Sequence, residues 1–169
     1  MAGMKECFEV LSKGVIVSNN SDKFFEVANF LNIEDNFEEF SDVVEKLGFK
    51  VIGESGYFYL TKETQEVESF VNNHKKAIIS ISILKQIYPL ISPNFSLKQT
   101  DFIVDFDKKR DENLENRLKF ITTNSDFKSM VEEFFKLLER FFIVEKIDKD
   151  SYKVLNSINY YIKIVESVG

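Results

Sequence analysis

The chain has 169 residues and carries 22 basic against 28 acidic side chains, which gives a net charge of −6. This length suits one ordinary domain or two small ones. An apolar share of 44% with 30% charged residues is typical of a globular chain and excludes extensive disorder. The acidic balance disfavours a stand-alone, high-affinity nucleic-acid binder, because phosphates repel an acidic surface.

Cysteine content and hydropathy indicate the compartment. The single cysteine, Cys7, rules out an intramolecular disulfide and favours a reducing environment. Residues 1–10 lack the basic and apolar regions of a secretory signal. The longest apolar-leaning stretch, residues 77–91, is interrupted by polar residues and is too short for a bilayer span, which needs about 20 apolar residues. We therefore expect a cytoplasmic protein that does not enter a membrane.

The first half of the chain reads as three helices followed by a hairpin. A short helix around residues 7–11 precedes a β-prone run at residues 15–17. Ser21 or Asp22 is expected to cap a second helix over residues 24–28, because short polar side chains accept hydrogen bonds from the first turn of a helix. These signals predict a compact helical start to the fold.

The third helix, residues 34–47, has the clearest period of this half. Its apolar residues recur every three or four positions and so share one face: Ile33, Phe37, Phe40, Val44 and Leu47. Gly48 follows directly, as is common after a helix. Two β-rich runs, residues 49–52 and 57–60, then flank a turn at residues 54–56 and predict a hairpin.

The second half repeats this order. Residues 75–90 predict a long apolar helix that Pro89 and Pro93 close, and Ser96 is expected to start the next helix. Residues 108–116 are highly charged and are interpreted as an exposed segment or a polar helix face.

The most amphipathic helix of the chain follows, with Ser125 or Asp126 as its expected cap. Its apolar positions are Phe127, Met130, Val131, Phe134, Phe135, Leu137, Leu138 and Phe141. A second hairpin over residues 143–155 and a last helix over residues 158–165 complete the chain. Three helices closed by a hairpin are the winged-helix pattern. We therefore expect a mainly α fold with small β-hairpins (α+β), built from tandem winged-helix domains at residues 1–72 and 73–169.

Signals of catalysis are weak. The one histidine, His74, lies in a polar stretch, and Cys7 is expected to be buried and inert. The sequence contains neither clustered metal ligands nor a glycine-rich phosphate loop. We therefore expect a protein that is not an enzyme and that has no metal and no cofactor.

DNA contact is expected to be weak. The third helix of the first half is strongly acidic, and its counterpart in the second half has mixed charge, so neither suits a DNA groove. The better basic candidates are Lys108, Lys109, Arg110, Arg117 and Lys119, interleaved with acidic residues. This stretch reads as a solvated charged loop, a weak phosphate-contact patch or a partner-binding segment.

The aromatic content favours binding of other macromolecules. The chain holds 18 Phe and 6 Tyr, more large rings than a core of this size requires. The candidate partner-binding residues are Phe24, Phe25, Phe30, Phe134, Phe135, Phe141 and Phe142. For each cluster, packing into the core is the competing interpretation.

Several segments resemble a known family. These are Gly14-Val15-Ile16-Val17, residues 45–49 leading into residues 56–60, the helix at residues 81–88 and the closing run from Phe142 to Ile162. The chain resembles the kite proteins, the tandem winged-helix partners of kleisins in SMC complexes. It is similar in particular to the MukE-like and MksE-like subunits of bacterial condensins, including those of Wadjet-type plasmid-defence systems.

The resemblance implies a non-catalytic accessory subunit. Such a subunit forms a homodimer, binds a kleisin and through it assists an SMC-like ATPase in DNA loading, chromosome organisation or plasmid defence. It would be cytoplasmic and nucleoid-associated, and would contact DNA weakly or only within the complex. Two other functions stay open at this point: a winged-helix transcription regulator that binds specific DNA, and an unrelated helical protein-interaction module.

Overall fold

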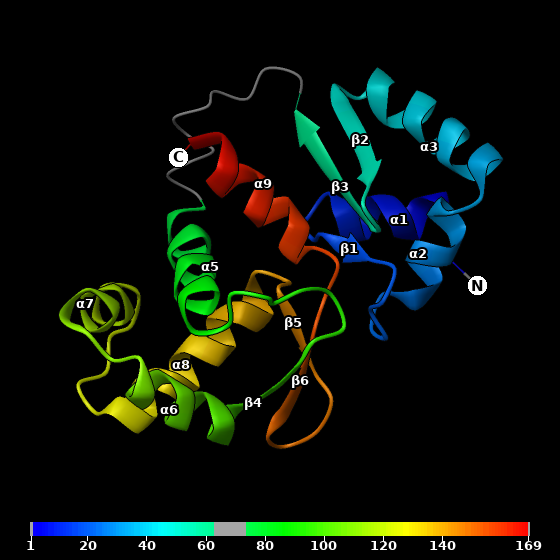
Figure 1. The fold of residues 1–169 in the computed structure, drawn as a ribbon. Helices are drawn as coiled ribbons and strands as arrows, with labels where there is room; N and C mark the ends of the chain where they lie inside the picture. The colour runs from blue at the N-terminus through cyan, green and yellow to red at the C-terminus, as the bar shows by residue number, and fades with distance from the viewer. Residues whose placement is uncertain (1, 63–73, 169) are drawn as a thin grey trace.

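The computed structural model describes residues 2–62 and 74–168, which we call the first and the second unit. The first unit contains α1 (Met4–Leu11), β1 (Val17–Ser18), α2 (Phe25–Leu31), α3 (Glu34–Lys46), β2 (Phe49–Glu54) and β3 (Tyr57–Lys62). The second contains α5 (Lys75–Ile87), β4 (Ser96–Lys98), α6 (Gln99–Lys108), α7 (Glu112–Ile121), α8 (Phe127–Arg140), β5 (Val144–Lys146), β6 (Ser151–Val154) and α9 (Ile158–Val168). The two units lie side by side (Figure 1). Among the described residues, no helix has the length and hydrophobicity to span a bilayer.

The first unit has the winged-helix order that the sequence predicts. The hairpin of β2 and β3 is confirmed, and its turn uses left-handed backbone at Ser55 (φ 51°) and Gly56 (φ 82°), as tight hairpin turns require. The sheet also has a third strand, because β1 pairs with β3 to give the order β1-β3-β2. Gly48 follows α3 in a left-handed conformation (φ 87°), which ends the helix.

Two details of the first unit differ from the prediction. Ile33 and Leu47 belong to the apolar stripe of α3, yet both are more than half exposed, whereas Phe40 and Val44 are buried. They lie at the two ends of the helix, beyond the neighbours that cover its middle. The second helix begins one residue later than expected, and Ser21 Oγ accepts the N–H of Phe24 (3.0 Å) just before it.

The second unit repeats the sheet topology, with strand order β4-β6-β5. The helix expected to start at Ser96 begins at Gln99, because residues 96–98 form β4 and Leu97 pairs with Tyr152 of β6. The first helix is also shorter than expected. α5 ends at Ile87, since Pro89 disfavours a helical conformation at the residue before it.

Residues 108–116, which the sequence predicts to be an exposed segment or a polar helix face, span the end of α6 and the start of α7. They lead into α7, which Asp111 caps by accepting the N–H of Leu114 (2.7 Å). One face of α7 is buried and packs against α5 through Leu114, Leu118 and Ile121. The charged residues occupy the opposite, exposed face.

The longest described helix, α8, is the centre of the second unit. Its predicted cap at Asp126 is confirmed, since this carboxylate accepts the N–H of Ser129 (3.1 Å). α8 contacts α5, α6, α7 and β5, so neighbours cover most of its circumference. Its buried side chains are Met130, Val131, Phe134, Phe135, Leu137 and Leu138.

The described residues form two hydrophobic clusters that do not follow the halves of the sequence strictly. One cluster lies within the first unit. The other fills the second unit but also includes Ile16 and Tyr57 from the first. The expected domain boundary between residues 72 and 73 lies outside the described residues.

A polar seam joins the two units. The Glu145 carboxylate accepts the hydroxyl of Ser21 (2.7 Å) and the backbone N–H groups of Asp22 (2.7 Å) and Lys23 (3.1 Å). Asn20 donates to the carbonyl of Val154 (3.0 Å) from the other end of the same loop. These bonds cross from the loop after β1 to the hairpin of the second unit and fix the orientation of the two units.

Candidate protein-interaction surfaces

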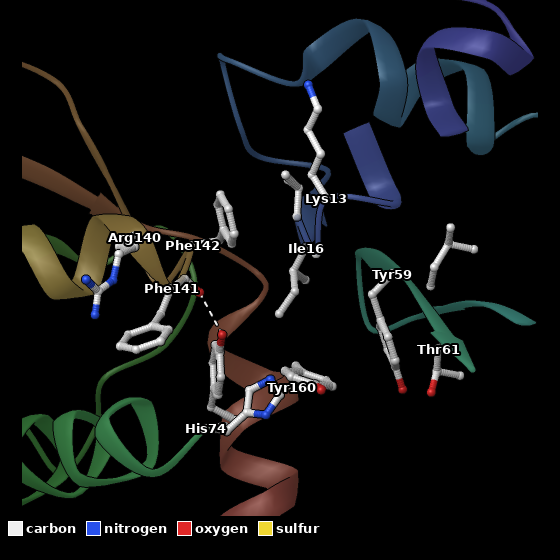
Figure 2. Close-up of a pocket in the computed structure, with 13 residues that line it drawn as sticks. Lys13, Ile16, Tyr59, Thr61, His74, Arg140, Phe141, Phe142 and Tyr160 are labelled. Atoms are coloured by element: carbon white, nitrogen blue, oxygen red, sulfur yellow. Dashed lines mark hydrogen bonds between the residues drawn. The ribbon is translucent and has the colours of Figure 1, made fainter. Parts of the chain in front are cut away.

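A groove between the two units encloses about 500 Å³ (Figure 2). We call it the inter-unit groove. It is lined by Lys13, Gly14, Val15, Ile16, Tyr59, Leu60, Thr61, His74, Arg140, Phe141, Phe142, Tyr160 and Tyr161. These side chains come from the loop before β1, from β3, from both ends of the second unit and from the end of α8.

Five of the residues that line the groove are phenylalanine or tyrosine. Tyr59 and Tyr160 lie with ring centroids 4.7 Å apart, and the Tyr161 hydroxyl donates to the carbonyl of Phe141 (2.9 Å). Burial raises the pKa of the Tyr160 and Tyr161 hydroxyls, so both stay neutral at physiological pH. His74 packs its ring 6.0 Å from that of Tyr160.

Two cations stand at the rim of the groove. Lys13 extends from the loop before β1, and Arg140 ends α8 with its guanidinium carbon 5.3 Å from the ring centroid of Phe141 (Figure 2). Neither cation forms a salt bridge with a residue of the described chain. Among the described residues, none of those that line the groove carries a carboxylate. The groove therefore offers an apolar wall with a positive rim.

A second concave surface lies on the outer side of the first unit, and we call it the α2–α3 patch. It encloses about 470 Å³ and is lined by Ala2, Phe25, Glu26, Asn29, Phe30, Ile33 and Asn36. Phe25 and Ile33 are 57% and 56% exposed. Exposed large apolar side chains that gather around a concave surface are typical of protein-binding sites.

Cys7 and His74 both pack against other side chains of the described chain. Burial raises the pKa of the Cys7 thiol to about 11, which keeps the sulfur protonated and unreactive. His74 lies among tyrosine rings. Among residues 2–62 and 74–168, no three His, Cys, Asp or Glu side chains gather in a way that could hold a metal ion.

A comparison with protein families matches residues 2–166 to the family of the condensin complex protein MksE. The chain belongs to the MksE family. It is therefore a non-catalytic accessory subunit of an SMC-type condensin complex, built from tandem winged helices, and a kleisin and an SMC ATPase are its partners in that complex. The search of curated proteins found no match.

The structure separates the aromatic candidates of this MksE-family chain into four groups, of which three reach the surface or the junction of the units. Phe25 and Phe30 line the α2–α3 patch, and Phe141 and Phe142 line the inter-unit groove. Phe24 packs edge-on against Phe142, with centroids 6.4 Å apart, where the two units meet. Sequence reasoning missed several residues of these surfaces, namely Lys13, Ile33, Arg140, Tyr59, Tyr160 and Tyr161.

Phe134 and Phe135 are core residues, which corrects their assignment as partner-binding candidates. They are 0% and 1% exposed, so neither ring reaches a partner while the chain is folded. Both pack against Phe102, at centroid distances of 5.2 and 5.4 Å. Two consecutive rings are buried because α8 has neighbours on several sides.

Three of the five basic candidates are engaged within the chain. Lys109 Nζ donates to the carbonyl of Ile87 (2.9 Å) at the end of α5. Arg117 donates to Ser82 Oγ (2.9 Å) and to Gln86. Arg110 pairs with its carboxylate neighbours Asp107 and Glu115. Lys108 and Lys119 are exposed. The structure therefore does not gather the five into one positive patch.

Because some of the basic candidates bind neighbouring groups and others are exposed, alanine substitution is predicted to affect stability differently at each. Arg117→Ala removes two hydrogen bonds that hold α7 against α5, and we expect the free energy of unfolding to fall by about 1–2 kcal/mol. Lys109→Ala removes a cation at the carbonyl end of α5 and is expected to cost about 0.5–1 kcal/mol. Urea denaturation measures both changes.

The exposed lysines are the matched controls. Lys108→Ala and Lys119→Ala are expected to stay within about 0.5 kcal/mol of the parent chain, as is usual for exposed positions. Equal losses for all four variants would contradict the structural role of Lys109 and Arg117.

Proposed function

We propose that this chain acts as a homodimeric adaptor of two winged-helix domains, residues 1–72 and 73–169, that binds the kleisin of its condensin complex in the cytoplasm, at the nucleoid. The observation that carries the proposal is the family match over residues 2–166, which spans both units. Two concave surfaces with exposed aromatic or aliphatic side chains support it, because an adaptor needs separate surfaces for a second copy and for another partner.

The α2–α3 patch suits a second copy of the chain. Its centre is apolar, with Phe25 and Ile33 largely exposed, and among the described residues that line it only Glu26 is charged. A surface of this kind pairs with itself around a two-fold axis without bringing many like charges together. It also lies on α2, on the side of the first unit away from the second (Figure 1), so pairing there leaves the inter-unit groove open.

DNA contact by this subunit is proposed to be weak, or to occur only within the complex. Exposed carboxylates cover the helix that would enter a DNA groove: Glu34, Asp35, Glu38, Glu39, Asp42 and Glu45 of α3. Phosphates would repel this face. Lys108 and Lys119 remain as exposed candidates for DNA contact. Two lysines that do not belong to a larger positive patch give weak, salt-sensitive binding.

The test is co-expression of the full chain with the kleisin of its complex, followed by native mass spectrometry. We expect a stable assembly that contains two copies of this chain. Phe25→Glu combined with Ile33→Glu places charges at the centre of the α2–α3 patch and is expected to convert the free dimer to a monomer, because an unpaired buried charge is costly. Light scattering gives the mass.

The control variant is Phe120→Glu, which changes an equally exposed ring on α7 (58% exposed) and should leave the dimer intact. A monomeric parent chain would refute the homodimer. Failure to bind the kleisin, with tight binding to one specific DNA sequence at physiological salt, would instead support a transcription regulator.

A further inference from the structure

Residues 20–24, which lead into α2, contact the second unit at every position. Asn20 accepts the N–H of Asn156 (2.9 Å), and Phe24 packs edge-on against Phe142. The three residues between them all donate to the Glu145 carboxylate: Ser21, Asp22 and Lys23. Five consecutive residues of the first unit therefore take their position from the second unit.

The helix that follows, α2, is short and does not cap itself. It has seven residues, and its N-cap residue is Phe24, whose side chain cannot accept a hydrogen bond from the first turn. The Phe24 N–H is accepted by Ser21 Oγ (3.0 Å), and this hydroxyl donates to Glu145 (2.7 Å). A helix of this length is not stable in water without packing contacts. The first turn of α2 therefore depends on a side chain of β5 in the second unit.

Phe142 adopts an unfavourable backbone conformation at the same junction. Its φ of 59° lies in the left-handed region, which is costly for a residue with a large side chain. Phe142 follows the end of α8, a position where glycine is common. A glycine there would relieve the strain but would remove the ring that packs against Phe24. The strained backbone thus serves to place this ring at the start of α2.

The two ends of α2 are held by different parts of the molecule. Val27, Ala28 and Leu31 are buried in the hydrophobic cluster of the first unit. Phe25 belongs to the first turn, where it is 57% exposed and lines the α2–α3 patch. It directly follows Phe24, so the contacts of the second unit with residues 20–24 set the position of Phe25.

We propose that the second unit positions Phe25 in the α2–α3 patch, through Glu145 and Phe142, and thereby controls how tightly a second copy of the chain binds there. This inference rests on the proposed pairing of two copies through the α2–α3 patch. Glu145 and Phe142 are positioning residues, since neither is among the described residues that line the patch. A shift of the β5–β6 hairpin would reach the patch through residues 20–24, without contact between the hairpin and the second copy.

The dissociation constant of the dimer, measured by sedimentation velocity on the full chain, tests the proposal. Glu145→Ala is expected to weaken the dimer about fivefold, a typical size for coupling between separate sites, and Phe142→Ala is expected to act in the same direction. Val131→Ala is the matched control, because it destabilises the buried core of the second unit instead. Its dimer affinity is expected to stay within about twofold of the parent chain. Unchanged affinity of Glu145→Ala, or an equal loss for Val131→Ala, would overturn the proposal.

A double-mutant cycle separates positioning of Phe25 from a general structural effect. In a chain that already carries Phe25→Ala, the further change Glu145→Ala is expected to weaken the dimer no more, because the side chain that Glu145 positions is gone. Additive losses of affinity would overturn the proposal.

Hydrogen exchange tests the hold on α2 in the monomer as well as in the dimer. The Ala28 amide, which donates to the Phe24 carbonyl (3.0 Å), is expected to exchange faster in Glu145→Ala, whereas the Val44 amide of α3 keeps its rate. An unchanged rate at Ala28 would overturn the positioning role of Glu145. A monomeric parent chain would refute the proposed dimer itself, and faster exchange at Ala28 would then still support the hold of the second unit on α2.

Discussion

Phe134→Ala is expected to lower the free energy of unfolding by about 3–5 kcal/mol, the usual cost of deleting a buried aromatic ring. The ring is fully buried and packs against Phe102 and Phe135, at centroid distances of 5.2 and 5.9 Å. We expect the helices around α8 to close only partly over the space that the ring leaves. Chemical denaturation of the purified chain measures the change.

The matched variant is Phe25→Ala, since both changes remove one phenylalanine ring. Phe25 is 57% exposed, so in the monomeric chain its loss is expected to cost less than about 1 kcal/mol. The Phe134→Ala variant should lose kleisin binding only in proportion to the fraction of its molecules that are unfolded. A small effect of Phe134→Ala on stability would contradict its place in the core.

Glu145→Ala is expected to lower the free energy of unfolding by about 2 kcal/mol, because hydrogen bonds to a charged acceptor contribute more than neutral ones. The substitution removes the acceptor for the hydroxyl of Ser21 and for the N–H groups of Asp22 and Lys23. These bonds join the two units. We therefore also expect the thermal transition in calorimetry to broaden as the units begin to unfold separately.

Two further variants test whether the hydrogen bonds to the Glu145 carboxylate cause the loss of stability. Glu145→Gln keeps one acceptor oxygen without the charge and should lie between the parent chain and Glu145→Ala. Glu132→Ala removes an exposed carboxylate of α8 and is expected to change stability by less than about 0.5 kcal/mol. Equal losses at positions 145 and 132 would show that the seam contributes nothing specific.

The order of elements could be predicted because its signals are local. The period of α8, its cap at Asp126 and the turn at residues 54–56 each lie within a few residues of the element they define. β4 could not be predicted, because three residues become a strand only through pairing with β6, which is distant in sequence. For α7, the spacing of Leu114, Leu118 and Ile121 carried the signal, and the surrounding charges obscured it.

The candidate surfaces were less predictable than the fold. Cations such as Lys109 and Arg117 look alike in sequence whether they face solvent or bind a neighbouring helix, and tertiary packing decides between the two. The same holds for paired phenylalanines: Phe134 and Phe135 are both buried because α8 has helices on several sides. The inter-unit groove joins residues from five separate segments, so no spacing in the sequence indicates it.

The placement of Tyr57 has a consequence for synthesis of the chain. Its ring is completely buried, yet it belongs to the hydrophobic cluster of the second unit and packs 6.0 Å from Tyr160, nine residues before the last residue of the sequence. Chains fold from the N-terminus as they leave the ribosome. The first unit therefore emerges with an uncovered tyrosine, and its surface is completed only when α9 has been made. An mRNA truncated before codon 160 would thus yield a product with an exposed apolar surface. Chaperones and proteases would bind this product, and it would not function as half of the subunit.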